Sequence, residues 1–354
     1  MRKYLPGLSV TLLCLLLVAA FTPVPYVILE PGPVFDTLGS DSGKSIIRIS
    51  GTKTYPTTGE LNMTTVSETG GPEQGVNLFQ AVWAWVNPDA SVMPREALYN
   101  EGTTQQQDYQ AASEDFSTSQ SNAIAAALTY LHKPVNAEIA VTSVTFDAPA
   151  DGKLHAADRI LSVDGHAVQS PDQVVKSVRG KKIGFTHSFV VMRSNKKLTV
   201  SVKSAAYPDD PSTAADETKT PYVGIGVGYF YSADFQIKFG LEDVGGPSAG
   251  GMFALALVDK LTPGPLTGGK IIAGTGTMSP QGKIGAIGGI QHKMLGAKLA
   301  GAKLFIAPIS NCDEVIGHVP SGLTVVPAST LSQAVEDIKA FKAGKTLKKC
   351  SAAK

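Results

Sequence analysis

The stretch EDVGGPSAGG, residues 242–251, places Ser248 among small residues, and an apolar segment follows directly at residues 252–260. The apolar segment predicts a helix, so that Ser248 would lie at its beginning. A serine in this position has an unhindered hydroxyl, and the free N–H groups of the first helical turn could hold a developing negative charge. The serine could equally be a plain N-cap, because serine is a favoured capping residue. This segment alone leaves both interpretations open.

A second segment decides between them. Residues 269–293 read GKIIAGTGTMSPQGKIGAIGGIQHK, and a predicted helix and an apolar strand at 303–307 follow. Together the two segments resemble the proteolytic domain of Lon-type peptidases, in which GPSAG carries the nucleophile and the lysine that closes GG(L/V/I)xxK is the base. The resemblance implies that Ser248 is the nucleophile, that Lys293 is its general base, and that Thr275 lies beside the base.

The proposed base needs a special environment. A serine hydroxyl is a poor nucleophile until a base takes its proton, and a solvated lysine has a pKa of about 10.4. Burial among Ile287, Ile290 and Met294 would disfavour the ammonium form and lower this pKa. We therefore expect Lys293 to be partly buried and within hydrogen-bonding distance of Ser248.

One position departs from the family's pattern. The family has an aspartate three residues before the nucleophile, where this chain has Gly245. Asp243 and Glu242 are the nearest acidic residues, and we expect either of them to support the dyad or merely to stabilise the loop. His292 adjoins the presumed base and is predicted to be an exposed helix residue, because lysine occupies the family's position.

A second unit precedes the catalytic motifs. Its sequence contains strands, a helix and a signature in the order 137–144 (strand), 148–165 (APADGKLHAADRILSVDG), 171–179 (helix), 187–193 and 197–203 (strands). This unit resembles a bacterial PDZ domain, except that Ala157 replaces a glycine of the pattern. The resemblance implies a groove that takes an extended protein or peptide substrate by strand addition.

The predicted fold class is α+β: an N-terminal transmembrane helix, a β-rich PDZ-like domain and a Lon-type α+β proteolytic domain. The strand at 59–66 and a helix at 117–132, with Ser117 or Ser119 as its N-cap, resemble early pieces of the Lon fold. We therefore expect the PDZ domain to be inserted within that fold. The predicted divisions are 1–24 (transmembrane signal-anchor), 25–135 (an α/β segment that could complete the Lon fold), 136–205 (PDZ domain), 206–221 (linker), 222–345 (proteolytic domain) and 346–354 (polar tail).

The N-terminal sequence predicts export. Arg2 and Lys3 precede residues 4–29, which contain no charged residue. Within this stretch, residues 4–24 come near the ~20 residues that a bilayer requires. Basic residues before the segment place the N-terminus in the cytoplasm. We expect a single-pass protein of the cell membrane, with this helix in the bilayer and the catalytic domain on the extracellular side. A cleaved signal peptide is the alternative, because residues 18–20 (VAA) suit a signal peptidase.

Composition excludes several other functions. The net charge of +1 gives no electrostatic reason to expect nucleic acid as a partner. No Cys/His spacing resembles a zinc site, and neither a metal nor a cofactor is expected. Cys14 lies in an apolar run, and the Lys-rich surroundings of Cys350 argue against a disulfide with Cys312. Residues 39–45 (GSDSGKS) are one residue short of a P-loop, and a strand is predicted after them, so no ATPase is expected.

These features predict an ATP-independent serine endopeptidase that cleaves exported or membrane proteins. The alternative is a non-catalytic, membrane-anchored PDZ scaffold with a degenerate peptidase domain. The intact Ser248 and Lys293 favour the enzyme. A homo-oligomer would be compatible with the resemblance, since Lon-type domains often form hexameric rings.

Overall fold

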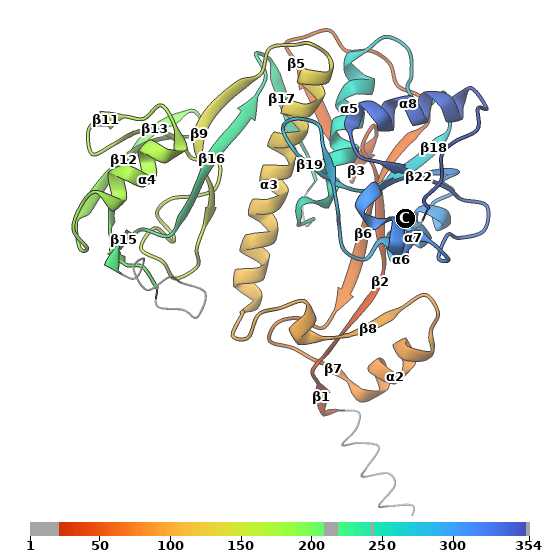
Figure 1. Cartoon of the computed structure of the whole chain (residues 1–354), viewed down its shortest axis with the longest axis horizontal. Coiled ribbons are helices and arrows are strands. Elements are labelled where there is room, and N and C mark those ends of the chain that lie inside the picture. Colours follow the sequence, from red (N-terminus) through yellow and green to blue (C-terminus); the bar gives the residue numbers. More distant parts are fainter. Residues whose placement is uncertain (1–20, 209–218, 242–243, 352–354) are drawn as a thin grey trace, which may run out of the picture.

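A computed structural model describes residues 21–208, 219–241 and 244–351. Figure 1 shows a larger body and a smaller β-rich body on either side of one long helix, α3. A six-stranded sheet forms the centre of the larger body. Its strands are, in order, β22 (Thr324–Ala328), β21 (Leu304–Pro308), β18 (Ile271–Gly274), β6 (Glu60–Thr69), β2 (Tyr26–Asp36) and β8 (Ser91–Pro94).

Helices cover both faces of this sheet, because the inner strands are apolar on both sides. Ile272 and Ile306 point to one face, where they join the core made with the helices α3, α5 and α8. Ala273 and Phe305, one residue away, point to the other face and pack against α6. These helices are α3 (Gln105–Tyr130), α5 (Gly250–Leu261), α6 (Ile290–Leu299) and α8 (Leu331–Lys342).

The central sheet joins segments that lie on either side of the PDZ-like unit in the sequence. Residues 60–63 of β6 pair in parallel with residues 271–274 of β18. The strand β5 (Ile47–Ser50) likewise pairs with β17 (Gln236–Phe239). The pairing that an inserted PDZ domain requires is therefore present.

The smaller body is built on the sheet β13-β12-β10-β9-β16, with α4 (Pro171–Arg179) packed against it. Its strands are β9 (Asn136–Val144), β10 (Arg159–Val163), β12 (Thr186–Arg193), β13 (Lys196–Lys203) and β16 (Ile225–Ser232). Asp164 and Gly165 form the tight turn between β10 and β11 (His166–Ala167), both with positive φ. The edge strand β16 comes from a segment that the sequence assigned to the proteolytic unit.

Short elements complete the fold. They are β1 (Pro23–Val24), β3 (Ser40–Asp41), β4 (Lys44–Ser45), β7 (Val76–Asn77), α2 (Leu78–Val86), η1 (Arg95–Ala97), β14 (Ala205–Ala206), β15 (Pro221–Tyr222), η3 (Pro247–Ala249), β19 (Thr277–Met278), β20 (Ile284–Gly285), η4 (Ile309–Asn311) and α7 (Cys312–Val315).

The helix predicted at 117–132 begins much earlier. The helix α3 starts after Thr104, whose hydroxyl accepts from the Gln107 N–H while the Gln107 side chain accepts from the Thr104 N–H. This reciprocal capping box, Thr-x-x-Gln, marks a helix start in the sequence itself. Ser117 and Ser119 therefore lie inside the helix, and their prediction as N-caps was wrong.

The transmembrane helix in the predicted fold class is corrected. Within residues 21–208, 219–241 and 244–351, none of the helices has both the length and the apolar character needed to cross a bilayer. Residues 1–20, most of the predicted segment 1–24, lie outside the described residues. Of the apolar run at 4–29, residues 23–24 and 26–29 pair as strands in β1 and β2, because Pro23 and Pro25 disfavour a continuous helix there. The described chain is a mixed α+β protein built from two bodies.

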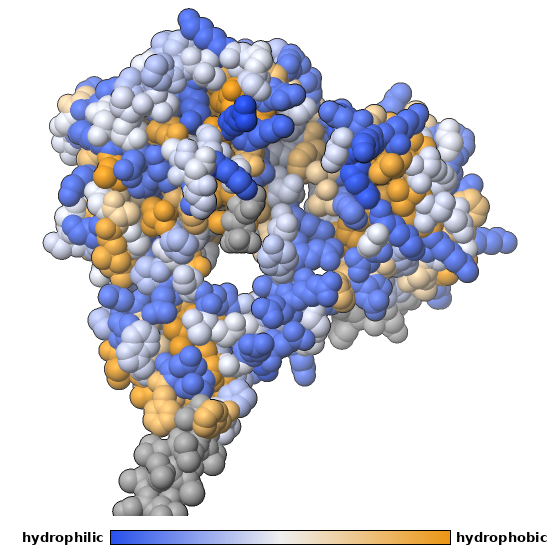
Figure 2. Space-filling view, turned by 180° about the vertical axis from the view of Figure 1, so that it is seen from behind, coloured by the Kyte–Doolittle hydropathy of each residue, from blue (hydrophilic) through white to orange (hydrophobic). Residues whose placement is uncertain are grey.

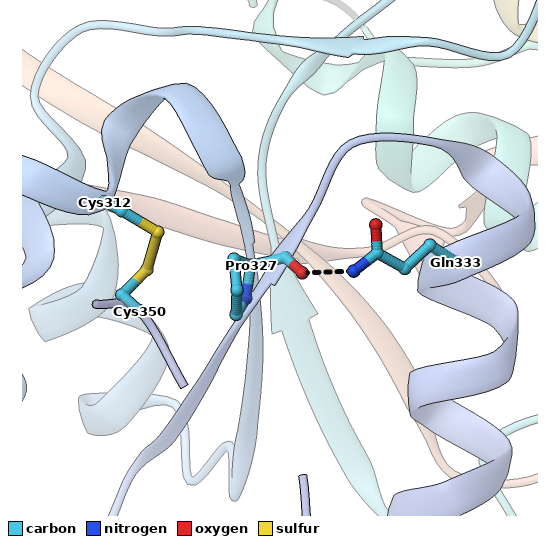
Figure 3. The surroundings of a disulfide bond; sticks show 4 residues. All are labelled: Cys312, Pro327, Gln333 and Cys350. Atoms are coloured by element: carbon cyan, nitrogen blue, oxygen red, sulfur yellow. Dashed lines mark hydrogen bonds between the residues drawn. A yellow bond between two sulfur atoms is a disulfide. The ribbon is translucent and has the colours of Figure 1, made fainter. Parts of the chain in front are cut away.

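The disulfide that the sequence disfavoured is present. Cys312, the first residue of α7, is bonded to Cys350 near the end of the described chain, with a Cα–Cα distance of 5.2 Å (Figure 3). On the other side of β22 in the same view, the Gln333 side chain of α8 donates to the Pro327 carbonyl oxygen at 2.9 Å. The bond holds the segment after α8 against the core between the sheet and α6, where Cys350 packs. Lysine residues near Cys350 do not prevent this, because they remain exposed to solvent.

We predict that Cys350→Ser lowers the free energy of unfolding by about 4 kcal/mol, since the bond closes a loop with a sequence separation of 38 residues. Denaturant titration of the wild type and the variant measures the difference. In the presence of a reductant the two proteins should unfold alike. If the two proteins are equally stable without reductant, the disulfide does not stabilise the fold.

Ala157, which replaces the glycine of the PDZ pattern, has a φ of +66°. An L-residue pays roughly 1–2 kcal/mol in this region, whereas glycine does not. We therefore predict that Ala157→Gly raises the free energy of unfolding by about 1 kcal/mol, measured by thermal denaturation. Ala156→Gly, at a neighbour without positive φ, is the control and should give no such gain.

Candidate active site

Ser248 lies in the 3₁₀ turn η3, directly before α5. The side chain of Ser248 does not cap the helix, because the N-cap residue of α5 is Ala249 and no side-chain capping bond forms there. The N-cap interpretation of Ser248 is therefore wrong. Small neighbours are needed here, since a Cβ on Gly250 would lie only 2.8 Å from both the Ser119 Oγ and the Met278 Cβ.

The helix α6 brings Lys293 to Ser248. The Lys293 Nζ donates to the Ser248 Oγ at 2.8 Å and to the Thr275 Oγ1 at 3.3 Å. Thr275 follows directly after β18, and its hydroxyl donates to the Ser248 carbonyl oxygen at 3.2 Å. The contact expected between Ser248 and Lys293 is thus present, with Thr275 touching both residues.

Lys293 is almost completely buried, with 4% of its surface exposed. Ile290 and Met294, its neighbours on α6, are fully buried in the adjoining core. This burial lowers the pKa of Lys293 from 10.5 to about 8. A neutral amine is therefore accessible near physiological pH, as general-base chemistry requires.

The predicted acidic helpers, Glu242 and Asp243, lie outside the described residues. The loop that follows them is held by α3. The Gly246 N–H donates to the Ala112 carbonyl oxygen at 2.8 Å, and the Ser119 Oγ donates to the Pro247 carbonyl oxygen at 2.9 Å. Sequence analysis missed this role of α3, because the contacting residues lie more than 100 positions apart and no local pattern marks them.

The same helix also holds the PDZ body. The Glu114 carboxylate accepts from the Val144 N–H at 3.1 Å, and the Gln110 side chain donates to the Val144 carbonyl oxygen at 3.0 Å. Further along α3, the Ser121 Oγ accepts from the Tyr231 N–H at 2.7 Å. One helix therefore fixes the sheet of the PDZ body and the loop before Ser248.

A cleft of about 510 Å³ opens over the dyad. Ser248 and Lys293 line it together with residues 63–68 of β6, and Leu29, Phe35 and Leu98 make its walls apolar. Pairing with β18 ends at Met63, so that β6 beyond it has a strand partner only on its β2 side. The cleft can accommodate an extended chain along this strand.

His292 is buried rather than exposed, with 7% of its surface accessible. Its Nε2 lies 2.9 Å from the Ser91 Oγ of β8. Burial lowers the pKa of His292. The prediction of an exposed residue was wrong, because the imidazole packs in the fold and contacts β8. His292 makes no hydrogen bond with Ser248 in the described structure.

Comparisons with known proteins match the chain to two families. The family described as the Lon protease (S16) C-terminal proteolytic domain matches residues 227–340, and the PDZ domain family matches residues 117–204. A Lon protease from Geobacter metallireducens is 36% identical over 104 residues, which are 28% of this chain and 12% of that protein. Lon protease 1 from Bacillus subtilis is 34% identical over 124 residues, 34% of this chain and 16% of the relative.

The chain spans only 12% and 16% of these curated relatives. Among solved structures, the PDZ domain of an SdrC-like protein from Listeria monocytogenes is 30% identical, with a TM-score of 0.22 over 25% of this chain and 86% of that chain. The chain therefore combines a region similar to the Lon-type (S16) proteolytic domain with a region similar to PDZ domains.

The buried lysine should cost stability. Because its pKa is 10.5 when solvated and about 8 in the fold, the unfolded chain binds more protons between these pH values. The stability of the wild type should therefore rise from pH 8 to pH 10.5. Lys293→Met removes a penalty of about 3 kcal/mol below pH 8 and should flatten this rise. Denaturant titrations at pH 7 and pH 10 measure the free energy of unfolding, with Lys298→Met on the same helix as the control. If the stability of the wild type changes as little between these pH values as that of Lys293→Met, the burial argument is contradicted.

Proposed function

We propose that the chain is an ATP-independent serine endopeptidase in which Ser248 is the nucleophile and Lys293 the general base. The observation that carries the proposal is the 2.8 Å contact between the Lys293 Nζ and the Ser248 Oγ, made by a lysine whose pKa burial lowers to about 8. Ser248 does not cap α5, and it is half-buried in the lining of the cleft, so that a substrate in the cleft can reach its hydroxyl.

The mechanism follows from this geometry. The neutral Lys293 amine takes the hydroxyl proton as the Ser248 Oγ attacks the substrate's carbonyl carbon. The N–H groups of Ser248 and Ala249, in the turn η3 directly before α5, can donate to the resulting oxyanion. The ammonium then protonates the leaving amine, and the acyl-enzyme is hydrolysed by water. Thr275 orients the amine throughout.

Independence from ATP is supported by the structure of residues 39–45, the segment whose sequence comes near a P-loop. In that segment β3 and β4 form a hairpin, with positive φ at Ser42 and Gly43. A phosphate-binding P-loop instead leads into a helix whose N-terminus faces the phosphates. Residues 39–45 therefore have the wrong geometry for a nucleotide.

Substrate binding by the PDZ body is supported by a groove of about 360 Å³ between α4 and β16. Val174, Val175 and Val178 line one side, and Ile225 and Val227 of β16 line the other. Because β16 is the edge strand of its sheet, an extended segment of a protein substrate can pair with it. The helix α3 holds this body and the loop before Ser248 in one arrangement.

Action outside the cytoplasm is supported by the Cys312–Cys350 disulfide. Structural disulfides persist in oxidising compartments and are rare in the reducing cytoplasm. We propose that the catalytic domain faces such a compartment and cleaves exported or membrane proteins.

The full chain should hydrolyse casein and a short fluorogenic peptide, and Ser248→Ala and Lys293→Ala should each lower kcat/KM by about 10³-fold or more. Wild-type activity should rise with pH up to about 8, where Lys293 becomes neutral, and then level off. Equal turnover by the wild type and both variants would eliminate the dyad. If the wild type and both variants bind casein but none of the three hydrolyses it, the scaffold alternative is favoured.

A groove variant separates substrate selection from chemistry. Val175→Asp places a charge in the PDZ groove, and should slow casein cleavage while leaving hydrolysis of the short peptide unchanged. Val319→Asp is the matched control, because Val319 has nearly the same exposure, 43% against 40%, outside the groove.

A further inference from the structure

The helix α2 (LFQAVWAWV) presents its large side chains to solvent. Only Ala81 and Ala84 are buried, against Ile28 and Val76. The exposed large apolar residues form the α2 apolar face, which consists of Leu78 (44% exposed), Phe79 (47%), Val82 (49%), Trp83 (55%), Trp85 (82%) and Val86 (72%). An ordinary surface helix does the opposite, with large apolar residues inside and polar ones outside.

The α2 apolar face also lacks charge. Residues 74–88 contain neither an acidic nor a basic residue. A protein-binding surface normally surrounds its apolar centre with a charged or polar rim, whereas aromatic residues without charges are typical of the interface between lipid and water. The face therefore suits an uncharged apolar environment better than a second folded protein.

The position of α2 points to the same environment. The two residues directly before α2 form β7, which pairs with β1, the first strand of the described chain. Phe21, 81% exposed, lies just before β1, and residues 4–20 contain no charged residue. Figure 1 places α2 and β1 at the same end of the molecule, and Figure 2 shows apolar residues gathered at that end.

We propose that the α2 apolar face inserts into the outer layer of a lipid bilayer, so that α2 lies along the membrane surface. Burial of Trp85, Val86 and their neighbours supplies the attraction. Since residues 74–88 are uncharged, anionic headgroups are not needed, and uncharged phosphatidylcholine should suffice. This surface is separate from the cleft over Ser248, and the proposal does not depend on peptidase activity.

The chain provides its own probe, because Trp83 and Trp85 are its only tryptophans. The full chain is mixed with phosphatidylcholine vesicles that carry bromine either near the headgroup or near the end of the acyl chain. The tryptophan emission should shift to shorter wavelength and lose most of its intensity to the shallow bromines, and less to the deep ones. Addition of an anionic lipid or of salt should change little.

Variants with a single tryptophan show which of the two side chains is quenched more strongly by bromine. In Trp83→Phe the remaining signal comes from Trp85, the more exposed residue, and should be quenched more than the signal of Trp85→Phe. Trp85→Ser in a Trp83-bearing chain should reduce quenching of Trp83. Leu299→Ser, at an apolar residue of α6 with 74% exposure, is the matched control and should leave it unchanged.

Two results would overturn the proposal. If vesicle-bound chain keeps its tryptophans unquenched by bromine and open to aqueous acrylamide, another segment makes the contact. If the emission shifts with protein concentration in the absence of lipid and bromine has no effect, the α2 apolar face is covered by a second copy of the chain. Neither result depends on residues 1–20, which contain no tryptophan.

Discussion

The parallel pairing of β6 with β18 is the constraint on which the other features depend. It joins residues 60–63 to residues 271–274, which lie on either side of the PDZ body in the sequence. Once these strands pair, the intervening chain must leave the sheet and return to it. Thr275 follows the last paired residue of β18, and the free part of β6 becomes a wall of the cleft. The geometry of the candidate site is therefore a consequence of the pairing between distant segments.

The site itself is built by desolvation. Within the described residues, burial is the cause of the lowered pKa of Lys293. This arrangement makes the amine useful as a base, and it also places an unfavourable charge in the fold at neutral pH. Stability and reactivity are thus opposed at Lys293. The apolar residues of α6 that stabilise the core are the same residues that dehydrate the amine.

The helix α3 gives the two bodies a common support. Residues 110–121 contact the PDZ sheet and the loop that leads to Ser248. A peptide held at β16 would therefore be presented by a body with a defined position relative to the dyad. The end of the molecule that carries α2 lies apart from the PDZ body (Figure 1), which leaves the groove accessible if α2 lies on a membrane.

Local sequence determined much of this protein. The GPSAG, GTG and GGIQHK segments indicated Ser248, Thr275 and Lys293 in turn. The PDZ signature indicated its strands and turn, because these features depend on neighbours in the chain. Only the tertiary structure decided what depends on distant contacts. It showed that Ser248 is not a cap, that β16 belongs to the PDZ sheet, that His292 is buried under β8, and that Cys312 and Cys350 meet. Such contacts leave no periodicity or spacing in the sequence, since their partners are chosen by packing.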